Sequence, residues 1–239
     1  MNTLSEETRS KLSGVSVATL CTALYKRGLR NQTLQDVHPL RHGRGNMVGP
    51  AYTLRYIPAR EDLNQLEVFR NPEHPQRLGV ESCPVGSVMV MDSRKDARAA
   101  SAGAILVTRL MVRGVAGIVT DGGFRDTHEI AALDIPAYHQ RPSSPTNLTL
   151  HQALDLNVPI ACGDVAVWPG DIVVGDDEAV CILPAAIAEE LADEAVEMTC
   201  FEDFVTESVR EGASIIGLYP ATKPETLEKF EAWRMKVGR

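Results

Sequence analysis

The sequence predicts a mixed α/β fold, because helical and strand periodicities alternate along its 239 residues. Residues 104–113 carry apolar side chains at helical spacing. Residues 115–120 form a nearly continuous apolar run, which is typical of a strand buried on both faces. Short strands and turns then alternate over residues 158–184. Helical patterns over residues 4–28 and 185–204 predict helices at the N- and C-terminal ends.

Composition narrows the class of protein. A hydrophobic content of 44% and a charged content of 23% are those of an ordinary globular protein, and we expect one domain over residues 1–239. The net charge of −8 argues against non-specific nucleic-acid binding, because no basic excess is present to displace counterions. No apolar run is long enough to span a membrane, and the start MNTLSEETRSKL does not resemble a signal peptide.

The cysteines indicate a reducing compartment. They are odd in number, widely scattered and without any Cys-x-x-Cys pair, which makes structural zinc improbable: Cys21, Cys83, Cys162, Cys181 and Cys200. We therefore expect reduced, mostly buried thiols and a cytoplasmic location.

The first half of the chain begins with two helices. Ser5 and Ser16 are suitable N-cap residues for them, and the second helix is expected to end at Gly28. Residues 36–57 then alternate between turn and strand. Their GRGNMVG string resembles a phosphate loop, but it lacks Gly-Lys-Ser/Thr and precedes a strand, so we exclude that function.

Residues 58–82 are polar and predict a surface excursion with one short helix near 63–69. A strand over 88–92 follows, and then a basic loop over 93–98. This loop has two interpretations: a solvated loop, or extra positive charge that attracts an acidic substrate.

The second half predicts a helix over 127–133 capped by Thr127, a strand over 135–139 and a loop over 140–150. After the β-rich stretch, an amphipathic helix over 185–204 and a C-terminal helix over 223–236 complete the chain.

The candidate site lies where the buried strand ends. Gly114 terminates the preceding helix, and the strand leads into the segment DGGFRD, which places Arg125 beside Asp126. Arginine binds a carboxylate through two parallel hydrogen bonds, and aspartate is a hard ligand for Mg²⁺ or Mn²⁺. One turn could thus hold a small keto acid and a metal ion. The alternative is a solvated loop salt bridge.

These residues resemble the signature of the RraA-like family. The matching features are Gly103 before an apolar helix, the run Arg-Gly-Val-Ala-Gly over 113–117, Asp121-Gly122, and Arg125-Asp126. The family includes metal-dependent 4-hydroxy-4-methyl-2-oxoglutarate / 4-carboxy-4-hydroxy-2-oxoadipate aldolases and the regulator of ribonuclease E activity. The resemblance covers about residues 14–212, with 220–239 as a helical extension. It implies a three-layer β/β/α swivelling-domain fold.

The resemblance also implies a site and an assembly. Arg125 would bind the substrate carboxylate and keto oxygen, and Asp126 would bind Mg²⁺ or Mn²⁺. The backbone around Gly103, Ala104, Ile105 and Leu106 would hold the pyruvyl group. Glu202, or alternatively Glu197, would reach the metal site of a neighbouring subunit. The expected assembly is a homotrimer or a dimer of trimers with sites between subunits.

One departure from the family concerns position 104, where the aldolases carry an acidic residue and this chain has Ala104. Asp96 and Asp121 are the two candidates to replace that acid. Two functions follow from the resemblance: a lyase acting on a small acidic 2-oxo acid, by retro-aldol cleavage or oxaloacetate decarboxylation, and a non-catalytic regulator of ribonuclease. A menaquinone methyltransferase function is set aside, because no glycine-rich cofactor loop is present.

Overall fold

A long strand, β2 (Met47–Pro58), organises the main sheet, because three strands pair with its two edges. On one edge it pairs in parallel with β3 (Val88–Asp92). On the other it pairs antiparallel with β12 (Ile172–Gly175) and then with β9 (His151–Leu156). The main path runs β1-β7-β5-β3-β2-β12-β13. Its remaining members are β1 (His38–Pro39), β5 (Gly117–Thr120), β7 (Ala137–His139) and β13 (Val180–Leu183).

This computed structural model describes residues 4–239, so the first three residues of the expected domain lie outside it. Strand β5 confirms the buried strand expected over 115–120, and all four of its residues are buried. In β3, alternate side chains enter different cores: Met89 and Met91 face one side of the sheet, and Val88 and Val90 face the other. The sheet is therefore covered on both faces.

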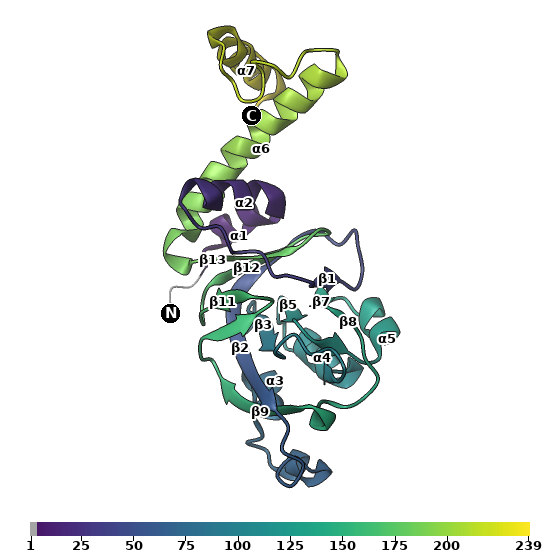
Figure 1. Ribbon diagram of the computed structural model, residues 1–239. Coiled ribbons are helices and arrows are strands. Elements are labelled where there is room, and N and C mark those ends of the chain that lie inside the picture. The colour runs from purple at the N-terminus through teal and green to yellow at the C-terminus, as the bar shows by residue number, and fades with distance from the viewer. Residues whose placement is uncertain (1–3) are drawn as a thin grey trace.

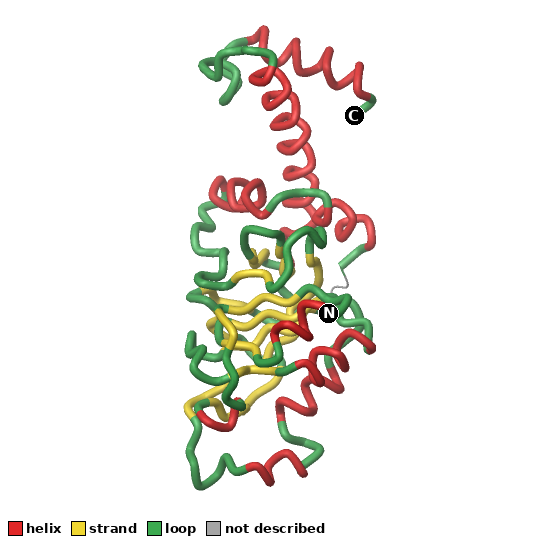
Figure 2. Tube along the Cα trace, turned by 90° about the vertical axis from the view of Figure 1, so that its right-hand side faces the viewer, coloured by secondary structure: helices red, strands yellow, loops and turns green. Residues whose placement is uncertain are grey.

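The two faces carry different layers. Helices α3 (Pro75–Ser82), α4 (Ala104–Val112) and α5 (Thr127–Ala132) lie on one face, as Figure 2 shows, and pack on the core that contains Met89. The hairpin of β10 (Ile160–Cys162) and β11 (Val165–Val167) packs on the other face. This arrangement confirms the expected three layers of strand, strand and helix.

The N-terminal helices α1 (Glu6–Ser13) and α2 (Val17–Lys26) lie against β12 and β13 at one end of the sheet (Figure 1). Both expected N-caps are confirmed. The Ser5 hydroxyl accepts a hydrogen bond from the Thr8 amide, and the Ser16 hydroxyl accepts one from the Thr19 amide, each at 3.0 Å.

A helical arm stands off this end of the molecule (Figure 1). It consists of the outer part of α6 (Ala188–Arg210) and of α7 (Pro224–Val237), which confirms the expected C-terminal helix. The arm has a small core of its own, made of Cys200, Phe204, Val205, Leu218 and Phe230. Helix α6 is longer than the expected 185–204, and its first expected turn is the 3₁₀ helix η3 (Ala185–Ile187). Over residues 4–239, no helix is long and apolar enough to cross a membrane.

Two loop regions are more regular than expected. The excursion over 58–82 contains the 3₁₀ helix η1 (Leu66–Arg70) and also α3, which the sequence did not predict. Gly79 weakens the helical signal of α3, and it packs closely on Leu156, since a Cβ there would lie 2.7 Å from Leu156 Cδ2.

The region after 140 is also more regular than expected. It contains β8 (Arg141–Pro142), the 3₁₀ helix η2 (Asn147–Thr149) and strand β9. These short elements depend on pairing with distant parts of the chain, which local propensity does not encode.

Candidate active site

A small parallel sheet beside the main one brings the candidate residues together. Strand β4 (Ala100–Ala102) pairs with β6 (Gly123–Phe124), and β6 pairs with β8. Because paired parallel strands end at the same edge, Gly103 after β4 and Arg125 after β6 become neighbours. The Arg125 amide donates a hydrogen bond to the Ala102 carbonyl at 3.1 Å and fixes this register.

Gly103 allows the turn after β6 to close on the start of α4. A Cβ at Gly103 would lie 2.7 Å from Asp126 Oδ2 and 2.8 Å from Arg125 Cγ, distances that side chains essentially never adopt. The Ala104 amide donates to Asp126 Oδ2 at 3.2 Å, so the carboxylate lies at the first turn of α4. That position favours a negative charge.

Asp126 has a left-handed backbone, with φ of 56°, and occupies the N-cap position of α5. The expected cap, Thr127, is instead the first helical residue, which corrects that assignment. Aspartate tolerates this conformation better than most residues, so the turn can project both charged side chains outward.

Arg125 and Asp126 line the same cavity, which has a volume of about 220 Å³. Arg125 Nε lies 3.6 Å from Asp126 Oδ2, and their side chains are 47% and 36% exposed. Within residues 4–239, the terminal nitrogens of Arg125 have no acceptor, so the guanidinium is free to bind a ligand.

The cavity lining also includes residues that the sequence did not single out. Arg77 of α3 stacks on Phe69, with its guanidinium carbon 4.3 Å from the ring centroid. Neighbouring Gln76 is buried and donates to the Tyr56 hydroxyl at 3.0 Å and to the Ser101 carbonyl at 2.7 Å, which holds α3 against β4. Pro75 at the first helical position was the available signal for α3.

Asn147 of η2 also lines the cavity and is 4% exposed. Its side-chain oxygen accepts a hydrogen bond from the Thr146 hydroxyl at 3.2 Å. Its side-chain nitrogen has no partner among the residues described. A buried amide nitrogen without an acceptor is costly, so this donor is suited to a bound ligand.

The backbone amides expected to hold a pyruvyl group are partly in use. The Leu106 amide donates to the Gly103 carbonyl, and the Ala104 amide donates to Asp126. In the described chain, the Ile105 amide is left without an acceptor. The Ile105 amide therefore remains available to donate a hydrogen bond to a ligand.

Neither suggested substitute for an acid at position 104 lines the cavity. Asp121 is buried and accepts hydrogen bonds from the amides of Ser93, Lys95 and Gly163, while burial raises its pKa to about 6. Asp96 pairs with Arg98 at 2.7 Å, and the hydrogen bonds from that guanidinium lower the Asp96 pKa to about 2. Both carboxylates therefore have structural roles.

Two of the three cations in the basic loop over 93–98 form ion pairs, and the third donates to a backbone carbonyl. Arg94 donates to the Leu150 carbonyl at 2.9 Å, Lys95 pairs with Asp164 at 2.7 Å, and Arg98 pairs with Asp96. None of these cations lines the cavity. The structure supports the interpretation as a structural loop.

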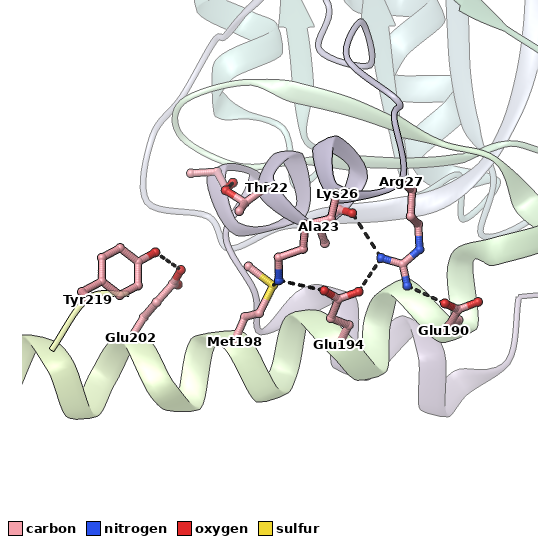
Figure 3. Close-up of polar contacts among 10 residues, drawn as sticks. Thr22, Ala23, Lys26, Arg27, Glu190, Glu194, Met198, Glu202 and Tyr219 are labelled. Carbon is pink, nitrogen blue, oxygen red and sulfur yellow. Dashed lines mark hydrogen bonds and ion pairs between the residues drawn. The ribbon is translucent and has the colours of Figure 1, made fainter. Parts of the chain in front are cut away.

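The two candidate glutamates of α6 lie outside the cavity. Glu202 accepts a hydrogen bond from the Thr19 hydroxyl at 2.9 Å. It accepts another from the Tyr219 hydroxyl at 3.3 Å (Figure 3). Glu197 pairs with Arg234 of α7 at 2.8 Å. A contribution of either carboxylate to the site of a neighbouring subunit stays a prediction.

Asp126 is the one carboxylate among the described residues that line the cavity. Within residues 4–239, no group of three or more His, Cys, Asp or Glu side chains is placed to hold a metal ion. A single hard oxygen ligand fits Mg²⁺, which usually keeps several waters and binds through one or two carboxylates.

Comparison with known proteins identifies the family. The family model described as RraA-like, Aldolase/RraA, matches residues 17–182, which is most of the chain. The protein belongs to the RraA-like family. A relative from Halalkalibacterium halodurans, named "putative 4-hydroxy-4-methyl-2-oxoglutarate aldolase", is 27% identical over 85% of this chain and 90% of its own length.

Solved structures agree with this assignment. Streptomyces coelicolor RraAS2, described as an unusual member of the RNase ES inhibitor RraA protein family, is 29% identical, with a TM-score of 0.76 over 85% of this chain and 98% of its own. A Pseudomonas syringae protein at 20% identity has the same fold, with a TM-score of 0.76 over 90% of this chain and 98% of its own. The matched segment of the RraA-like family contains Gly103, Arg125 and Asp126.

Proposed function

We propose that this RraA-like protein is a divalent-metal-dependent lyase that releases pyruvate from a small acidic 2-oxo acid. The observation that carries the proposal is the joint placement of Arg125 and Asp126 at one cavity, enforced by the β4–β6 pairing and by Gly103. The aldolase name of the Halalkalibacterium halodurans relative supports the same reaction class.

Arg125 would bind the substrate at its 2-oxo acid end. Its free terminal nitrogens can donate two parallel hydrogen bonds to a carboxylate, or one to the carboxylate and one to the keto oxygen. When the bond between C3 and C4 breaks, its electron pair moves toward the keto oxygen. A guanidinium fixed beside that oxygen stabilises the developing charge.

Asp126 is the residue that would hold Mg²⁺ or Mn²⁺. Its Oδ2 accepts a hydrogen bond from the Ala104 amide. No donor within the described chain contacts Oδ1, so this oxygen remains free to bind a cation. A bound divalent cation would supply Lewis-acid polarisation of the 2-oxo acid. The remaining ligands would be water, substrate or Glu202 of the partner subunit.

Because Ala104 carries no acidic group, it affects which of two reactions is favoured, retro-aldol cleavage or oxaloacetate decarboxylation. Retro-aldol cleavage requires a base to remove the proton of the 4-hydroxyl group, and the cavity has no second carboxylate among the described residues. Oxaloacetate decarboxylation starts without a base: the C3–C4 bond breaks, carbon dioxide leaves, and C3 then takes a proton to give pyruvate. We therefore expect decarboxylation to be the faster of the two reactions.

The cavity also suits a second anionic group. Arg77 has no ion-pair partner in the described chain, and the Asn147 side-chain nitrogen lacks an acceptor. A guanidinium and an amide donor that line one cavity can together bind a carboxylate. The substrate would then be a 2-oxo dicarboxylate, with Arg125 and Arg77 binding different carboxylates.

Pyruvate release tests the proposal. Metal-free protein would be assayed on oxaloacetate and on a panel of 4-hydroxy-2-oxo acids, with Mg²⁺, with Mn²⁺ and with excess chelator. The account predicts turnover with metal and none with chelator, after correction for the metal-catalysed reaction without protein. Absence of pyruvate from every compound would contradict a lyase function.

A second function is supported by the 29% identity to RraAS2, described as a relative of an RNase ES inhibitor. In that function the fold would bind a ribonuclease without turnover. Inhibition of an RNase E-type enzyme by both the parent and Arg125→Lys, together with no pyruvate release, would favour the regulator. No inhibition at concentrations well above that of the ribonuclease would exclude it.

A further inference from the structure

Two cysteines far apart in the sequence adjoin each other between α2 and β13. Cys21 lies on α2, and its sulfur is 3.1 Å from the Thr33 hydroxyl. Thr33 in turn forms an antiparallel bridge with Cys181 of β13. Cβ atoms of directly opposed residues are about 5 Å apart. Cys21 therefore contacts the residue that directly faces Cys181, and it packs against the buried cluster that contains Cys181.

The two thiols differ in access to solvent. Cys21 is half-buried and lines a cavity of about 180 Å³, together with Tyr25, Arg30 and Thr33. Cys181 is buried behind it. A small reagent can therefore reach Cys21 first, from the cavity that Arg30 also lines, while Cys181 is placed to react with the product. Nothing in the lyase function proposed above uses this cavity.

The two thiols also differ in acidity. The hydrogen bond from Cys181 is the largest cause that lowers the pKa of Cys21, to about 6, with a further contribution from Thr33. The same hydrogen bond and burial raise the pKa of Cys181 well above its ordinary value. Thiolates are the nucleophiles in thiol chemistry, and with this lowered pKa Cys21 is a thiolate at neutral pH.

We propose that Cys21 and Cys181 form a redox-active dithiol that peroxides oxidise to an intramolecular disulfide. The Cys21 thiolate attacks one peroxide oxygen, the O–O bond breaks, and a Cys21 sulfenic acid and hydroxide form. The Cys181 sulfur then displaces the sulfenic hydroxyl, its proton leaves with that oxygen as water, and the S–S bond forms. In total, two thiols and one hydrogen peroxide give one disulfide and two waters.

The other cysteines provide internal controls. Cys83, Cys162 and Cys200 are buried, and in the described chain none of them lines a cavity with a second thiol. Burial also raises the pKa of Cys83 to about 12. Structural thiols of this kind are inert, so selective oxidation of one pair is expected.

The test is peptide mapping of the folded, reduced protein after treatment with a few equivalents of hydrogen peroxide and alkylation of the remaining thiols. The expected product is a cross-linked pair of peptides containing Cys21 and Cys181, which a thiol reductant separates. Cys181→Ser should stop at a Cys21 sulfenic acid that dimedone traps, and Cys200→Ser should form the cross-link like the parent.

Two results would overturn the proposal. One is a parent protein in which Cys21 and Cys181 remain alkylatable while the other thiols oxidise. The other is a Cys21 that proceeds to sulfinic acid without cross-linking, although Cys181 is present. The parent measurement needs no substitution, so a variant that fails to fold leaves the test intact.

Discussion

The α-carbon of Gly103 lies against the carboxylate of Asp126, so closely that a methyl group on Gly103 would be 2.7 Å from Oδ2. This contact joins the start of α4 to the turn after β6, and it requires glycine for space, since the backbone there is extended, with φ of −131°. The start of α4 places the backbone amides of the site, and the turn after β6 places Arg125 and Asp126. The contact fixes the distance between these two parts.

Gly103→Ala should therefore separate Asp126 from the first turn of α4. We expect turnover to fall on the order of 10²-fold, the scale at which small displacements of reacting groups matter. Steady-state pyruvate release measures this effect. Gly14→Ala is the matched control, because its Cβ would make only ordinary contacts, the nearest at 3.6 Å. Equal activity of Gly103→Ala and parent would show that the contact does not position the site.

Arg77→Met should raise KM for a 4-hydroxy-2-oxo dicarboxylic acid at least about 10-fold and leave kcat nearly unchanged. The reason is that the distal carboxylate keeps its charge in retro-aldol cleavage, so Arg77 would bind it equally in the ground and transition states. The same substitution should change little for a monocarboxylic 2-oxo acid. Arg70→Met, on the exposed η1 helix, is the control. A selective loss of kcat would place Arg77 near the reacting bond instead.

Much of the fold could be predicted because its signals are local. Ser5 and Ser16 are caps that act on amides three residues away, and β5 is an uninterrupted apolar run. The Arg125–Asp126 turn was recognisable because both residues follow directly from that strand. These features depend on side chains adjacent in sequence, so periodicity and residue type identify them.

The rest of the cavity could not be predicted, because its parts meet only in the folded chain. Arg77 belongs to a helix that packs on Leu156 through Gly79, and Leu156 lies on a strand that was itself unpredicted. Asn147 lies in a single 3₁₀ turn with no periodic signal. In the basic loop, the ion pair of Lys95 depends on Asp164, which lies far from Lys95 in sequence.

Acidification should destabilise the fold in part through His139. This side chain is buried against Phe124, with ring centroids 5.7 Å apart, and burial, with a smaller effect of His38, lowers its pKa from 6.5 to about 4. Between these values the unfolded chain binds a proton that the folded chain does not. Stability is therefore full above about pH 6.5 and falls as the pH drops toward 4.

Urea unfolding at several pH values measures this effect. His139→Gln should reduce the slope of unfolding free energy against pH in that window by up to about 1.4 kcal/mol per pH unit, the value for one proton. His74 and His151 also have lowered pKa values, so the parent slope exceeds that of one group. An unchanged slope in His139→Gln would contradict this assignment.

Assembly is testable by mixing two inactive variants, Asp126→Ala and Glu202→Gln. If the partner subunit's Glu202 completes the site of Asp126, mixed assemblies contain some interfaces where both residues are intact, and part of the activity should return. Glutamine retains the hydrogen-bonding capacity of Glu202 toward Thr19 and Tyr219, which protects the fold. A mixture that stays inactive after confirmed subunit exchange would require the same test with Glu197→Gln.

The most direct test of the central claim is oxaloacetate turnover by Arg125→Lys, compared with the parent, at saturating Mg²⁺ and in excess chelator. The account predicts metal-dependent pyruvate release by the parent. It predicts a loss of turnover on the order of 10²-fold or more in Arg125→Lys, because lysine cannot donate the two parallel hydrogen bonds of a guanidinium. Arg109→Lys, an exposed residue of α4 paired with Glu81, should behave like the parent. Parent-like turnover by Arg125→Lys, or full turnover in chelator after metal-free preparation, would contradict the account.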